Sequence, residues 1–258
     1  MELRPIPSRE KKPRKTGITM VMDKGLSLNQ ARDLADTAGH LIDFLKLGFG
    51  TSYVSPHVKE KVKAYQQRGI KVFVGGTLFE AFLVRGQLED YFRYIDVLGL
   101  DAAEVSDGSM KVPHEDKCNF IRRLAAERTV VSEVGAKEAE VVLDHHSWIR
   151  QMNEELNAGS SFVIGEARES GTVGIFEQSG KADTSLIDDI IAGVPPEKII
   201  WEAPLKPQQV WFIKKLGSGV NLGNIAPADA IPLETLRLGL RGDTFFDVLP
   251  PDLQHLKL

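Results

Sequence analysis

The 258-residue sequence predicts an α/β protein that folds as a single (β/α)8 barrel, also called a TIM barrel. Short apolar runs rich in β-branched residues alternate along the chain with amphipathic stretches of helical length. The runs are apolar at successive positions rather than at every second one, which is typical of parallel strands covered by helices on both faces. Eight such units in about 250 residues match the usual size of this barrel.

A doubly wound open sheet is the alternative fold. In that fold a glycine-rich phosphate-binding turn usually follows the first strand. Here the first strand ends in residues 22–25 (MDKG), which match neither of the common glycine-rich motifs. We therefore favour the barrel, with a basic N-terminal arm over residues 1–16 and the barrel with its C-terminal tail over residues 17–258.

The expected elements follow from these runs and from helix start signals. Serine is a good N-cap, proline suits the first turn of a helix, and glycine commonly ends one. The four helices with such signals are expected over residues 28–39 after Ser27, 57–69 after Ser55 and Pro56, 114–128 after Pro113, and 208–217 after Pro207. The eight strands are expected over residues 17–23, 40–49, 71–76, 102–108, 129–135, 161–167, 198–204 and 219–225.

The composition limits the classes of partner. The net charge is −4, from 32 basic and 36 acidic residues, so bulk affinity for nucleic acid or an anionic membrane is not expected. No apolar run approaches the roughly 18 residues of a membrane-spanning helix. The single cysteine, Cys118, excludes an intrachain disulfide and a cysteine-rich zinc site. We expect a cytoplasmic protein whose basic arm is a solvated lead-in.

Ionisable and polar residues recur at the carboxyl ends of the expected strands. A charge in a strand that is buried on both faces is costly unless it is paired or opens onto water. In a (β/α)8 barrel, this end of the strands forms the active site. Six or more strands would therefore direct polar groups into one bowl, although a set of salt bridges at the barrel rim is the alternative. These residues are Asp23, Lys46, Glu104, Ser106, Glu133, Lys137, Glu166, Arg168, Glu202, Asn221 and Asn224.

The charge pattern indicates a class of chemistry. Several carboxylates can stay ionised close together only if cations neutralise them. One available cation is a divalent metal, and oxygen ligands without histidine or cysteine favour Mg²⁺ or Mn²⁺. The others are the side chains of Lys46, Lys137 and Arg168. A site with both kinds of cation suits a substrate that bears carboxylate or phosphate, and it suggests chemistry through a metal-stabilised enolate.

Eight stretches, in order along the chain, resemble the phosphosulfolactate synthase family. Two departures are small: Phe49 stands where a tryptophan is expected, and Ala136 where a second lysine is common. The stretches are residues 46–52 (KLGFGTS), 75–80 (GGTLFE), 104–109 (EVSDGS), 132–137 (SEVGAK), 166–171 (EARESG), 201–204 (WEAP), 221–225 (NLGNI) and 240–244 (LRGDT).

The resemblance implies Mg²⁺-dependent addition of sulfite to phosphoenolpyruvate, which gives (2R)-phospho-3-sulfolactate in coenzyme M and sulfolactate biosynthesis. Lys137 is the candidate general acid, and Lys46 is the second catalytic candidate. We also expect a homo-oligomer. The candidate substrate ligands are Arg168, Arg241, Asn224 and Ser106, and the candidate metal ligands are Glu104, Glu133, Asp23 and Glu166.

Two other functions are open alternatives. One is another metal-dependent barrel lyase or aldolase that acts on a phosphorylated or keto acid, in which Lys46 or Lys137 forms a Schiff base. The other is a non-catalytic role, because the plant relatives of the family include a heat-stress protein. The segment 168–183 is glycine-rich and long for a loop between a strand and a helix, so it is the expected lid.

Overall fold

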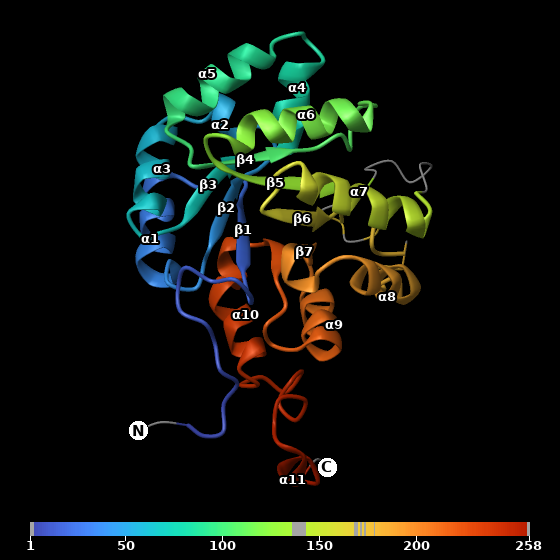
Figure 1. Ribbon diagram of the computed structural model, residues 1–258. Coiled ribbons are helices and arrows are strands. Elements are labelled where there is room, and N and C mark those ends of the chain that lie inside the picture. The colour runs from blue at the N-terminus through green and yellow to red at the C-terminus, as the bar shows by residue number, and fades with distance from the viewer. Residues whose placement is uncertain are drawn as a thin grey trace.

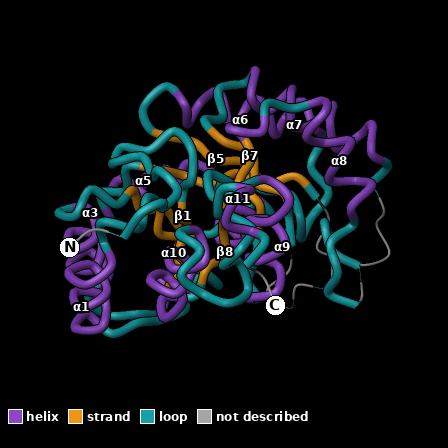
Figure 2. Tube along the Cα trace, turned by 90° about the horizontal axis from the view of Figure 1, so that it is seen from below, coloured by secondary structure: helices purple, strands orange, loops and turns teal. Residues whose placement is uncertain are grey.

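The structure of the chain is a computed structural model that describes residues 3–135, 143–167, 170, 172, 174–177 and 179–256. One parallel eight-stranded sheet curls into a barrel, and helices form a ring around it (Figure 1). Figure 2 shows the strands gathered in the middle of this ring. The predicted (β/α)8 barrel is confirmed. Across the described ranges, no helix is both long and apolar enough to cross a membrane.

All eight predicted strands are present, and each lies inside its expected range. The observed strands are shorter because the flanking residues form the turns that connect them to the helices. They are β1 (Thr19–Asp23), β2 (Phe44–Leu47), β3 (Lys71–Val74), β4 (Ala102–Val105), β5 (Thr129–Val134), β6 (Phe162–Gly165), β7 (Ile199–Glu202) and β8 (Leu222–Ile225).

The strands pair in the order β3-β2-β1-β8-β7-β6-β5-β4, so β3 and β4 are the two ends of the sheet. Two hydrogen bonds to side chains bridge these ends. The main-chain N–H of Val72 donates to Asp101 Oδ1 (2.8 Å), and that of Gly76 donates to Glu104 Oε1 (2.7 Å). The sheet is therefore nearly closed into a barrel.

The four helices with predicted start signals are α1, α3, α6 and α9. Ser27 caps α1 as expected: its hydroxyl accepts from the N–H of Gln30, and the Gln30 side chain accepts from the N–H of Ser27. The connection from β3 to β4 holds two helices, α4 and α5. The helices are α1 (Leu28–Ala38), α2 (Thr51–Val54), α3 (Val58–Gln66), α4 (Gly76–Leu83), α5 (Leu88–Leu98), α6 (His114–Ala125), α7 (His145–Asn157), α8 (Thr184–Gly193), α9 (Lys206–Leu216), α10 (Ala230–Arg237) and α11 (Pro251–Gln254), with 3₁₀ turns at Pro196–Lys198 and Pro227–Asp229.

The basic N-terminal arm packs against the barrel through Arg9, Lys12 and Arg14, but most of its described residues are exposed, so the expected solvated lead-in is partly correct. Arg9 pairs with Glu234 (2.9 Å), and Arg14 pairs with Asp43 (3.0 Å). Lys12 Nζ donates to three main-chain carbonyls. Most of these partners precede β2 and β3 or lie on α10, at the end of the barrel where the strands begin. The carbonyls that accept from Lys12 belong to Gly39, Ile42 and Arg68.

Candidate active site

The inward-facing residues divide the barrel into an apolar floor and a polar mouth. Each residue of the floor belongs to one buried cluster and lies two positions before a residue that lines the mouth cavity. Since alternate residues of a strand share one face, both members of each pair point into the barrel. From β1 to β7 the pairs are Met20/Met22, Phe44/Lys46, Phe73/Gly75, Ala102/Glu104, Val131/Glu133, Ile164/Glu166 and Ile200/Glu202.

The mouth cavity has a volume of about 350 Å³. Such a volume suits a small metabolite rather than a polymer. The exposed ring of Phe49 forms part of its wall, and the ammonium of Lys24 lies 5.7 Å from the centre of that ring. The ionisable groups that line it are all buried, and they are Lys46, Glu104, Glu133, Glu166 and Glu202.

Lys46 lies among these carboxylates. Its Nζ is 3.0 Å from Glu104 Oε2, 3.4 Å from Glu133 Oε2 and 3.3 Å from Glu202 Oε1. Burial alone lowers the pKa of Lys46, but the surrounding carboxylates outweigh burial and raise this pKa well above its ordinary value. The amine is therefore protonated at neutral pH and holds the three side chains together.

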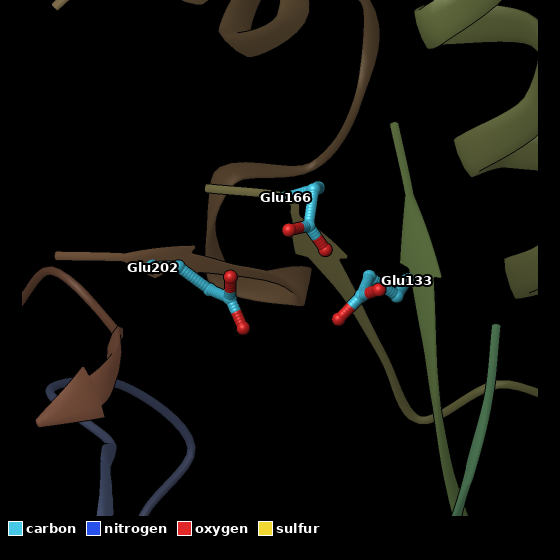
Figure 3. A group of neighbouring side chains, drawn as sticks. All are labelled: Glu133, Glu166 and Glu202. Carbon is cyan, nitrogen blue, oxygen red and sulfur yellow. The ribbon is translucent and has the colours of Figure 1, made fainter. Parts of the chain in front are cut away.

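Three of the carboxylates form a group with the spacing of metal ligands. One oxygen from each of Glu133, Glu166 and Glu202 lies within 4.8 Å of the others. Figure 3 shows these three side chains pointing toward one another. They come from β5, from the position after β6 and from the end of β7. Burial raises the pKa of Glu202 to about 7; Lys46 opposes this rise, and the Glu133 carboxylate adds to it. Two of the three carboxylates, those of Glu133 and Glu202, lie beside the Lys46 ammonium.

Gly76 is required where α4 begins, because the site leaves no room for a side chain. A Cβ there would lie 2.2 Å from Ser106 Oγ and 2.7 Å from Glu104 Oε1. The N–H of Gly76 also donates to that Glu104 oxygen (2.7 Å). Gly75 and Gly76 line the cavity as well, so this pair both opens the wall and fixes Glu104.

Asn224 enters the cavity through a backbone irregularity in β8. Against β1, Thr19 pairs with Leu222 but Val21 pairs with Ile225, so β8 carries one extra residue. Asn224 occupies this bulge at a φ of 53°, in the left-handed region that asparagine tolerates better than most residues. The side chain is buried, and its Oδ1 has no hydrogen-bond partner among the residues that the structure describes.

Asp23 lies apart from the cavity. Lys61 Nζ from α3 is 2.7 Å from its Oδ2, and the hydroxyl of Tyr65 donates to the same oxygen (3.1 Å). The N–H groups of Gly25 and Leu26 donate to its Oδ1 (2.8 and 2.7 Å). Both oxygens are thus occupied by the turn after β1 and by α3.

Two candidate substrate ligands also lie outside the cavity lining. The hydroxyl of Ser106 is buried and donates to a carboxylate oxygen of Glu80 on α4. Arg241 follows α10, where its Nε is 3.8 Å from Asp243 Oδ2. Of the predicted site, the structure brings together Lys46, Glu104, Glu133, Glu166 and Asn224.

The candidate acid Lys137 and the candidate anion ligand Arg168 lie outside the described residues, as does part of the expected lid 168–183. The sequence identifies Glu202 as a strand-end charge but does not place it among the candidate metal ligands. The spacing could have indicated that Glu202 faces the cavity, because Glu202 follows Ile200 by two positions as Glu133 follows Val131. Lys61 and Lys117, which are buried on α3 and α6, were missed altogether.

Comparisons with known proteins decide the family. The (2R)-phospho-3-sulfolactate synthase (ComA) family model matches residues 7–243. The chain belongs to this family. The phosphosulfolactate synthase of Methanocaldococcus jannaschii is 44% identical over 237 residues, which cover 89% of this chain and 94% of the relative. That of Methanothermobacter thermautotrophicus is 43% identical over 244 residues, which cover 92% of this chain and 95% of the relative.

Membership in the phosphosulfolactate synthase family makes the chain an enzyme, and it confirms the resemblance found in the sequence. A solved structure, the YdjI aldolase of Escherichia coli, is similar in fold with a TM-score of 0.56 at 11% identity. The match covers 83% of this chain and 76% of the aldolase chain, and it supports the barrel alone.

Proposed function

We propose that the chain catalyses the Mg²⁺-dependent addition of sulfite to phosphoenolpyruvate, which gives (2R)-phospho-3-sulfolactate. The family and the names of its relatives support the product. The observation that carries the proposal is the group formed by Glu133, Glu166 and Glu202 beside Lys46, in a cavity of about 350 Å³. The reaction forms a carbon–sulfur bond between two anions, so the site must supply positive charge.

The residues present fit Mg²⁺. All three donors are carboxylates, and Mg²⁺ prefers oxygen ligands at about 2.0–2.1 Å. Two ligands on opposite sides of such an ion lie about 4.2 Å apart, so a group within 4.8 Å needs only a small contraction. We therefore assign the metal to Glu133, Glu166 and Glu202. Glu104 is not a member of this group, and its two oxygens lie against Lys46 Nζ and the N–H of Gly76.

A bound Mg²⁺ supplies Lewis-acid stabilisation of the negative charge that develops on the substrate carboxylate. Sulfite attacks the CH₂ carbon of phosphoenolpyruvate, the electron pair moves toward the carboxylate, and a proton then adds to C2. Lys46 stays protonated and holds Glu104, Glu133 and Glu202 in place around the reacting groups. We keep Lys137 as the proposed proton donor to C2 and Arg168 as a proposed ligand of the anionic groups.

The structure argues against the aldolase alternative in which Lys46 forms a Schiff base. A lysine forms a Schiff base through its neutral amine. The raised pKa of Lys46, which its carboxylate neighbours cause, keeps the amine charged. A metal-assisted addition therefore fits this cavity better than a Schiff base at Lys46.

Phosphorus NMR tests the proposal. The protein is incubated with phosphoenolpyruvate and sulfite, first with Mg²⁺ and then with excess EDTA. We expect a new phosphate-ester signal that requires both sulfite and Mg²⁺. Folded protein that gives no such signal, or gives it equally in EDTA, contradicts the proposal.

A matched pair of variants tests the metal assignment. Glu166→Gln removes one proposed ligand, so the Mg²⁺ concentration for half-maximal rate should rise by about tenfold or more. Glu154→Gln is the control, because this glutamate lies on α7 and pairs with Arg150 (3.2 Å) at the surface. An unchanged metal titration in Glu166→Gln removes this residue from the ligand set.

A further inference from the structure

A buried lysine outside the cavity connects three elements at the back of the active site. Lys117 lies in the first turn of α6 with 1% of its surface exposed. Its Nζ is 2.7 Å from Asp107 Oδ1 and 2.8 Å from Glu155 Oε1. It also donates to the main-chain carbonyl of Glu133 (2.6 Å). These partners belong to the loop after β4, to α7 and to β5.

The fold alone does not explain a lysine at this position. Lys117 shares a helix face with Ile121 and Leu124, and all three are buried. The first turn of a helix also disfavours a positive charge. Buried ion pairs are often no more stabilising than apolar residues of similar volume, so this placement calls for another reason.

The contact with Glu133 supplies that reason. Lys46 holds the Glu133 carboxylate from inside the barrel (3.4 Å), and Lys117 holds the carbonyl of the same residue from outside (2.6 Å). Both the side chain and the main chain of Glu133, which approaches Glu166 and Glu202, are therefore held by a lysine. Without Lys117, the main-chain carbonyl of Glu133 loses this side-chain donor.

The loop after β4, residues 106–113, is also held from two sides. Lys117 holds Asp107 on one side. On the other side, Glu80 accepts from the hydroxyl of Ser106 and from the N–H of Ser109 (2.7 Å). Lys117 thus couples this loop to the end of β5, where Glu133 lines the cavity.

We propose that Lys117 is a positioning residue of the active site, which sets the main chain of Glu133 and the loop 106–113. Its effect on turnover rests on the proposed function, whereas its effect on the backbone does not. It acts through Glu133 and does not contact the substrate.

The test separates positioning from folding. Lys117→Met fills a similar volume but leaves the buried Glu155 without its cationic partner, which destabilises the fold by itself. The test variant is therefore Lys117→Met/Glu155→Gln, in which both buried charges are removed. Glu155→Gln alone is the matched control, because it leaves Lys117 on Glu133 and Asp107.

Three readouts are compared between the two proteins: turnover of phosphoenolpyruvate with sulfite, the Mg²⁺ concentration for half-maximal rate, and hydrogen–deuterium exchange. We expect the double variant to melt near the control, to lose about tenfold or more in kcat, and to need more Mg²⁺. Amides in 106–113 and 131–135 should exchange faster, while those in β1 and β2 should not. A partly unfolded sample would lower the rate but leave the metal requirement unchanged.

The outcomes are decisive in each case. A folded double variant with the rate, metal requirement and exchange of the control overturns the proposal. If the unmodified protein makes no product, the proposed function fails, and the exchange data alone decide the role of Lys117. If the double variant does not fold, Asp107→Asn replaces it, because Asp107 is partly exposed. Unchanged exchange in 106–113 would then refute the coupling to this loop.

Discussion

Substitution of Gly76 by alanine tests whether close packing under Glu104 sets the active site. The new Cβ would lie 2.2 Å from Ser106 Oγ, 2.6 Å from Ser106 Cβ and 2.7 Å from Glu104 Oε1. Non-bonded heavy atoms pack best at about 3.5–4.0 Å, so these atoms would have to move by roughly 1 Å. They have little freedom to do so, because Ser106 is hydrogen-bonded to Glu80 and Glu104 is paired with Lys46.

The size of the effect follows from two opposing contributions. Overpacking of a buried site costs about 1–3 kcal/mol. Alanine gains up to about 1 kcal/mol over glycine in a helix, and Gly76 is the first residue of α4. The two contributions leave a net loss of about 0–3 kcal/mol, and a loss in the middle of this range, about 1–2 kcal/mol, lowers Tm by about 2–8 °C in a protein of this size. A shift of about 1 Å at Glu104 should lower turnover about 100-fold.

Thermal denaturation and the phosphorus NMR rate measure the two effects. Gly75→Ala is the neighbouring control for Tm alone, because Gly75 lines the cavity and the atom nearest its added Cβ would be Lys46 Cε at 3.4 Å, an ordinary contact. Gly219→Ala is the distant control, since no atom lies within 4 Å of its added Cβ. Full activity and an unchanged Tm in Gly76→Ala would refute the reasoning that this packing fixes Glu104.

Three further predictions concern other parts of the chain. Asn224→Gly removes the backbone strain of a φ of 53°, which stabilises the folded state by about 1 kcal/mol. Glycine also raises the conformational entropy of the unfolded chain, which offsets this gain by about as much. Calorimetry should therefore show a similar Tm, while turnover falls. Lys12→Met leaves three carbonyls without their donor and should cost about 1–3 kcal/mol in urea unfolding, with kcat unchanged. Burial raises the pKa of Cys118, so its alkylation should stay slow in the native protein up to a higher pH than in unfolded protein; equal rates would contradict this.

The strands and the acidic mouth were predictable because both depend on short-range pattern. A residue two positions after a floor residue must share its face, so Val131 predicts the direction of Glu133, and Ile200 that of Glu202. The cavity position of Asn224 was predicted, but its cause was not. That cause is an extra residue in β8, and register between β1 and β8 is set by pairing across some 200 residues.

The contacts of the N-terminal arm also could not be predicted from local sequence pattern. Composition alone identifies a basic segment, but it does not show which acceptors the fold brings near it. Lys12 reaches carbonyls at the ends of α1 and α3, which leave their last carbonyls without helical partners. These acceptors come together only once the barrel has formed, so the sequence pattern predicted that the arm would be solvated.

Metal-ligand assignment requires the positions of cations as well as those of acids. Asp23 looks like a ligand in the sequence, yet Lys61 neutralises it from α3 at 2.7 Å. Inside the barrel, four glutamates face the single ammonium of Lys46 among the described residues. Two anionic substrates cannot enter such a cavity unless further positive charge accompanies them. The positions of the lysines therefore argue against Asp23 and leave Glu133, Glu166 and Glu202 as the proposed Mg²⁺ ligands.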